Sequence, residues 1–133
     1  MREHERWLKI AKEDLEVAKA LLKLEFFTTV TYNCQQSAEK ALKSYLVFKN
    51  HEILKSHDLN KLIELCKKFD MGFDKIYDSA DHLSPFATKF RYPTEFDIPD
   101  LHEAELAIKH AESIMRFVLK KISKPETGQV RMF

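Results

Sequence analysis

Glycine and proline are scarce in this chain, which has two glycines and four prolines among 133 residues. Sheets with many turns need more of these residues, so their scarcity favours long helices. Cysteine is also sparse. Cys34 and Cys66 lie on separate predicted helices without metal-ligand spacing. We therefore expect two reduced thiols in the core of a cytoplasmic protein.

A surplus of charge of one sign is missing as well. The 22 basic residues nearly match the 21 acidic residues, and the formal net charge is +1. This balance argues against binding DNA through bulk charge, although a small nucleotide needs only a local cluster. No stretch approaches the ~18 apolar residues of a membrane span, and the charged start MREHERW lacks the apolar core of a signal peptide. We expect no membrane association.

What the chain does contain is apolar residues at helical spacing. The spacing predicts helices at about 3–25, 27–50, 57–70, 73–84 and 100–123. A loop with two prolines occupies 89–100. The length suits one domain, so we expect an all-α, up-and-down bundle of four to five helices over 1–124 and a tail at 125–133.

Local signals mark the ends of these helices. Ser56 or Asp58 is placed to cap the third helix, Gly72 predicts its stop, and Pro85 ends or kinks the fourth helix. Alanines alternate on the main apolar stripes of the first and last helices. Small side chains allow close approach of helix axes, so these two helices are expected to be neighbours.

Each of the first two helices carries a second apolar stripe that polar residues interrupt. On the first helix, Asp14 interrupts a stripe made of Trp7, Ile10, Val17, Leu21 and Leu24. On the second, Gln35 and Glu39 lie within the stripe and Lys43 lies just beyond it, whereas Gln36 and Lys40 face further towards solvent. A buried carboxylate needs a partner. We hypothesise a polar pocket beside an apolar surface that meets a second subunit.

The pocket would contain Asp14, Gln35, Glu39, Lys43 and Arg91, the last from the proline-containing loop. A plainer interpretation without a pocket remains open. Glu39 and Lys43 also form an ordinary i,i+4 helix pair, and the side chain of Asp14 can reach solvent at the edge of its stripe. In the loop, Arg91 can form two parallel hydrogen bonds to a phosphate, Tyr92 can stack on a base and Pro93 stiffens the backbone. Equally, these three residues could cap a helix, pack and turn the chain.

Catalytic and cofactor motifs are missing. The six histidines form neither the Glu-x-x-His pattern of di-iron bundles nor His-Glu-x-x-His. No glycine-rich phosphate loop or nucleophile signature occurs. His57, beside Ser56 and Asp58, reads first as part of a helix start. We therefore expect no metal and no cofactor.

Four stretches together resemble the HEPN domain family (higher eukaryotes and prokaryotes nucleotide-binding). They are AKEDLEVAKALL at 11–22, QQSAEKALKSYL at 35–46, SHDLNKL at 56–62 and FRYP at 90–93. The resemblance spans about 5–122 and points to the small stand-alone prokaryotic members. It implies a dimeric helical bundle that binds nucleotides and partners a minimal nucleotidyltransferase, often as a toxin–antitoxin pair. It implies nucleotide-binding roles for six residues at the matching positions and for the neighbouring Tyr92. The six are Asp14, Gln35, Glu39, Lys43, His57 and Arg91.

Many relatives of this kind are metal-independent ribonucleases that carry an arginine and a histidine with four to six residues between them. Here Phe96, Asp97 and Ile98 occupy the positions that follow Arg91 at that spacing. The expected function is therefore a binding module. Two alternatives stay open: a ribonuclease toxin that uses His57 or His102 near Arg91, and an interaction or antitoxin subunit without a ligand.

Overall fold

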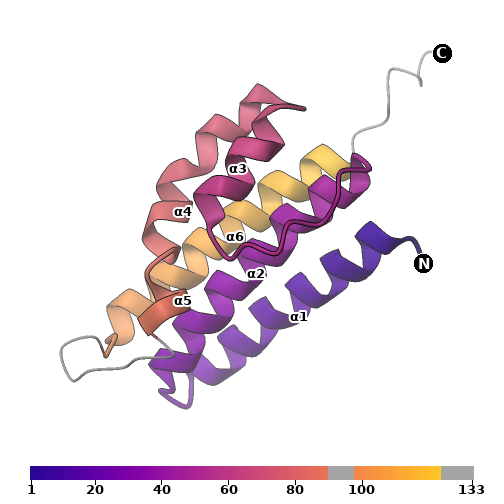
Figure 1. Cartoon of the computed structure of the whole chain (residues 1–133). Helices are drawn as coiled ribbons and strands as arrows, with labels where there is room; N and C mark the ends of the chain where they lie inside the picture. Colours follow the sequence, from indigo (N-terminus) through magenta and orange to yellow (C-terminus); the bar gives the residue numbers. More distant parts are fainter. Residues whose placement is uncertain (90–97, 124–133) are drawn as a thin grey trace.

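The computed structural model describes residues 1–89 and 98–123, which form a helical bundle (Figure 1). These residues contain six α-helices, one 3₁₀ helix and no strand. The elements are α1 (Glu3–Leu22), α2 (Phe27–Phe48), α3 (Leu59–Lys67), η1 (Met71–Ile76), α4 (Tyr77–Leu83), α5 (Phe86–Lys89) and α6 (Leu101–Ser123). The expected all-α bundle is confirmed.

Helix α2 lies at the centre of the bundle and packs against α1, α3 and α6. Thirteen of its 22 residues are buried, so it has little surface to offer to solvent. This explains why polar residues on its second stripe cannot simply turn towards water. Any charge on that stripe must find its partners inside the protein.

Two buried serines of α2 form hydrogen bonds to the backbone of α1. Ser37 Oγ donates a hydrogen bond of 2.8 Å to the carbonyl of Ala11, and Ser44 Oγ donates one of 2.9 Å to the carbonyl of His4. Such bonds need a close approach of the two helix backbones, which the small Ala11 permits. The alanines of α1 thus serve the contact with α2. The expected contact of α1 with α6 is also present, and the Lys19–Glu112 ion pair bridges it at 3.0 Å.

The first two helices end earlier than expected, because each closes in a turn with a left-handed residue. Glu25 and Asn50 have φ of 64° and 60°. Around Asn50, the amides of Asn50 and His51 donate to the carbonyls of Val47 and Leu46, the two bonds of a Schellman cap. Glycine usually takes this position, so the sequence offered no clear stop.

The third helix also differs from its prediction at both ends. It begins at Leu59, and the side chain of Asp58 caps it by accepting from the amides of Asn60 and Lys61. It ends at Lys67, whereas Gly72 lies within η1. The single helix predicted at 73–84 is a 3₁₀ turn followed by α4, and the short α5 after Pro85 was not predicted.

After α2 the chain runs back along that helix before α3 begins (Figure 1). Residues 51–58 have no regular secondary structure. This segment brings His57 back to the middle of α2. It is the element that positions the site described below.

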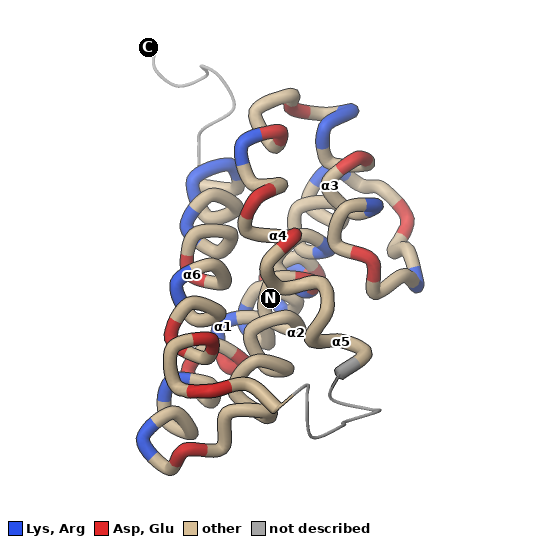
Figure 2. Tube along the Cα trace, turned by 90° about the vertical axis from the view of Figure 1, so that its left-hand side faces the viewer, with Lys and Arg blue, Asp and Glu red and all other residues tan. Residues whose placement is uncertain are grey.

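Along the helices of the described residues, lysines and arginines are interspersed with aspartates and glutamates (Figure 2). This distribution matches the near-zero net charge. Within the same part of the chain, no helix is both long and apolar enough to span a membrane.

Candidate functional site

Three of the predicted site residues lie one helical turn apart on α2 and are buried. The exposed fractions of Gln35, Glu39 and Lys43 are 0%, 3% and 6%. Lys43 Nζ donates to Glu39 Oε2 at 2.9 Å, and Gln35 Nε2 lies 3.5 Å from Glu39 Oε1. The i,i+4 pair is therefore present but buried, so it differs from the surface pairs that contribute little.

His57 joins this cluster from the returning segment. Its Nδ1 lies 3.0 Å from Glu39 Oε1 and 3.2 Å from Oε2. Its backbone carbonyl accepts a hydrogen bond of 3.2 Å from Gln35 Nε2. Gln35 and Glu39 therefore hold both the backbone and the ring of His57. His57 precedes Asp58, the cap of α3, but it also contacts the polar residues of α2.

The side chain of His57 is 56% exposed, although Glu39 is buried beneath it. A carboxylate only accepts hydrogen bonds, so Nδ1 carries the proton that faces Glu39. Nε2 is then the ring nitrogen left to meet a ligand. A neutral ring can accept a proton there, and a protonated ring can donate to a phosphate oxygen.

Two further residues complete the cluster. Gln36 Nε2 donates to Gln35 Oε1 at 2.8 Å, which fixes the orientation of the buried amide. The indole of Trp7 on α1 lies beside Lys43, whose Nζ is 5.8 Å from the ring centroid. Neither residue was expected in the site. Gln36 was assigned to solvent, and the apolar spacing of Trp7 indicated only a contact surface.

Asp14 does not belong to this cluster, because it pairs with Lys40 instead. The two side chains approach to 2.8 Å between α1 and α2 and are 22% and 24% exposed. The expectation of a solvated Lys40 was wrong. Among the described members of the hypothesised pocket, Asp14 thus contacts Lys40, whereas Gln35, Glu39 and Lys43 contact one another.

The loop residues of the hypothesis, Arg91 and Tyr92, lie outside the described residues, as does Pro93. Their contact with the cluster therefore stays a prediction.

Within the described part of the chain, three residues of the second apolar stripe of α1 are exposed. Ile10, Val17 and Leu24 are 43%, 45% and 62% exposed. Trp7 and Leu21 on the same stripe are half-buried. An exposed apolar stripe of this length on a helix is a typical contact surface for another protein chain.

The two cysteines pack in the core, as predicted. Both have an exposed fraction of 0%. Burial raises the pKa of Cys34 to about 12, with a smaller contribution from the charge of Glu112, and burial likewise raises the pKa of Cys66 to about 12. Thiols with such pKa values are not nucleophiles at neutral pH.

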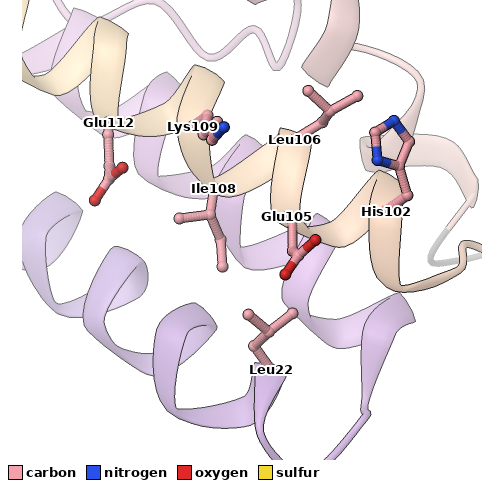
Figure 3. A pocket seen from close by; sticks show the side chains of 7 residues that line it. All are labelled: Leu22, His102, Glu105, Leu106, Ile108, Lys109 and Glu112. Carbon is pink, nitrogen blue, oxygen red and sulfur yellow. The ribbon is translucent and has the colours of Figure 1, made fainter.

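A cavity of about 350 Å³ opens elsewhere, between the end of α1 and α6 (Figure 3). His102, the second histidine considered for catalysis, lines it together with Glu105 and Lys109. None of the predicted site residues within the described part of the chain lines this cavity. His57 and His102 therefore occupy different sites.

Comparison with known proteins supports the resemblance found in the sequence. The family model described as "HEPN domain" matches residues 4–122. A protein of Methanocaldococcus jannaschii named "Putative toxin MJ1304" is 29% identical over 139 residues, which cover 92% of this chain and 89% of that protein.

Two crystal structures have a similar fold. TT1696 from Thermus thermophilus superposes with a TM-score of 0.77 at 23% identity, covering 91% of this chain and 99% of that one. ST0689, described as an archaeal HEPN homologue, superposes with a TM-score of 0.72 at 25% identity, covering 92% of this chain and 100% of that one.

Proposed function

Because this chain belongs to the HEPN domain family, we propose that it is a homodimeric, nucleotide-binding module of the cytoplasm. It partners a minimal nucleotidyltransferase in a two-component pair of the toxin–antitoxin kind. The toxin name of the relative from M. jannaschii supports the pairing. The exposed stripe of α1 supports the dimer.

The observation that carries the binding role is the half-exposed imidazole of His57 on a buried carboxylate. Gln35 and Glu39 hold His57 from both its backbone and its ring. A preorganised donor binds an anion with little loss of side-chain entropy. Protonated His57 therefore contacts a nucleotide phosphate through Nε2, and Lys43 balances the charge of Glu39 beneath it.

In this proposal Arg91 and Tyr92 complete the site, with the guanidinium on phosphate and the ring on the base. Asp14 contributes indirectly, since its ion pair with Lys40 fixes α1 against α2.

Isothermal titration calorimetry with ATP, GTP, CTP and UTP tests the binding role. We expect saturable binding by the parent protein and at least tenfold weaker binding by His57→Ala and by Arg91→Ala. His102→Ala is the matched control, because it removes an exposed histidine from a different site. The nucleotide role fails if the parent protein binds no nucleotide at millimolar concentration and Arg91→Ala behaves like the parent.

Partnership needs a separate experiment. Co-expression with the product of a neighbouring nucleotidyltransferase gene is expected to yield a complex that survives size-exclusion chromatography. If the two proteins elute separately at micromolar concentration, the two-component part of the proposal fails, whatever the outcome with nucleotides.

The His57–Glu39 contact also favours a second candidate, a metal-independent ribonuclease. An imidazole held by a carboxylate can remove the proton of a ribose 2′-hydroxyl while a cation stabilises the phosphate charge. RNA cleavage in the presence of EDTA tests this function. The candidate requires cleavage by the parent protein, loss of cleavage in His57→Gln and retained cleavage in His102→Ala. Any other pattern rejects it.

A further inference from the structure

A second group of histidines meets where α4 packs on α6, away from the residues used above. Asp78 and His82 are one turn apart on α4 and project from the same face. His110 comes from α6. One ligand atom from each of the three residues lies within 4.8 Å of the other two. The two imidazole rings stack, with centroids 4.1 Å apart and planes inclined by 19°.

Both histidines are oriented through the Nδ1 atom. His82 Nδ1 lies 3.1 Å from the backbone carbonyl of Asp78, which can only accept, so Nδ1 carries the proton. His110 Nδ1 lies 3.0 Å from the hydroxyl of the buried Ser79. This is the arrangement found around metal-ligating histidines, in which one ring nitrogen bonds to the protein and the other binds the ion.

We propose that Asp78, His82 and His110 bind one divalent transition-metal ion of the zinc, cobalt and nickel class. Two imidazoles and a carboxylate suit these ions, whereas magnesium and calcium prefer oxygen ligands alone. The carboxylate of Asp78 neutralises one of the two positive charges of the ion. Asp78 and His82 are exposed, so they can adjust to the ion, while half-buried His110 provides a fixed point.

Space for further ligands lies beside the histidines. A cavity of about 180 Å³ is lined by both of them, by Phe86 of α5 and by Glu103 of α6. Three protein ligands leave positions of the ion open to water or to an anionic ligand. Glu103 already takes part in capping α6, because its carboxylate accepts from the amide of Asp100. We therefore assign it to the wall of the cavity and not to the ligand set.

The site was not visible in the sequence, because no metal motif contains these residues. Asp78 and His82 alone are a common pair on a helix surface. The third ligand lies 28 residues further along the chain and is brought in only by the packing of α4 on α6. The proposal is independent of the nucleotide role of His57.

The test uses protein without a histidine tag, freed of metal with EDTA and titrated with Zn²⁺, Ni²⁺ and Co²⁺. We expect one ion per chain for at least one of these metals. Affinity should fall at least tenfold in His82→Ala and in His110→Ala. His102→Ala is the matched control, since it removes another exposed histidine of the α6 region and leaves the cluster intact.

A second readout guards against loss of folding. His82 is exposed, so His82→Ala should keep the helical circular-dichroism signal and the melting temperature of the metal-free parent. Added metal should raise the melting temperature of the parent and of His102→Ala, but not that of His82→Ala. The proposal is overturned if none of the three ions binds saturably below 1 mM, or if His82→Ala and His102→Ala bind equally well.

Discussion

The imidazole of His57 lies 3.0 Å from Oε1 of Glu39, although the two residues are 18 positions apart in the chain. Glu39 is buried on the central helix, whereas the His57 ring is half-exposed on the returning segment. The carboxylate thus connects the core to the surface, since Lys43 contacts it from within and His57 from outside.

Replacing Lys43 by methionine should lower the free energy of unfolding by about 3 kcal/mol, because Glu39 would remain as a buried carboxylate without its cation. Lys40→Met is the matched control. It breaks a partly exposed ion pair on the same helix and should cost about 1 kcal/mol or less. Urea denaturation measures both. Equal losses in the two variants would contradict a buried role for the Glu39–Lys43 pair.

The two thiols should resist modification in the native protein at pH 8. Burial raises the pKa of both cysteines to about 12, so almost no thiolate is present and the reagent has no access. A disulfide reagent such as DTNB should react with two thiols in 6 M urea and with fewer than one in buffer. Rapid reaction of either native thiol would show that the core is open there.

The same raised pKa values predict a loss of stability in alkali. The folded pKa of about 12 lies above the unfolded value of 9.0, so unfolding favours release of the proton once the pH exceeds 9. This contribution to stability is complete below about pH 9 and is lost as the pH rises towards 12. Urea midpoints at pH 8 and pH 10 measure it. A Cys34→Ala, Cys66→Ala double variant should show a smaller difference between the two pH values.

Asp58 should stabilise α3 through its cap. Its carboxylate accepts from the amides of Asn60 and Lys61, so Asp58→Ala should lower the free energy of unfolding by about 1 kcal/mol. Asp58→Asn keeps an acceptor and should retain most of the stability. Both follow from urea denaturation, and an Asp58→Asn variant as unstable as Asp58→Ala would exclude the cap as the cause.

The uncovered stripe of α1 should form the dimer contact. Val17→Glu places a charge at its centre, where the native side chain is 45% exposed. Sedimentation equilibrium should give a dimer for the parent and a monomer, or a dimer weakened at least tenfold, for this variant. Lys12→Gln changes the net charge equally at an exposed position off the stripe, so it should leave the dimer intact. A monomeric parent at 100 μM would refute the contact.

Helix content and the buried faces could be predicted because both depend on neighbours in the chain. Ala11, Leu15 and Ala18 recur at helical spacing and are buried. Helix ends were harder to predict, since Glu25 and Asn50 adopt a left-handed conformation that usually indicates glycine. For the site, the helical spacing correctly predicted that Gln35, Glu39 and Lys43 lie close together on α2.

The partners of these groups depend on how distant segments pack, which local spacing does not specify. Asp14 could reach water, a loop arginine or a lysine of another helix, and the α1–α2 contact selects Lys40. The path of the returning segment brings His57 onto Glu39, and the packing of α4 on α6 brings His82 onto His110. The amino-acid pattern therefore specifies which faces of the helices are buried. The pairing of charged and imidazole groups follows only once those faces have packed, because each of these groups has several partners that are compatible with its position in the chain.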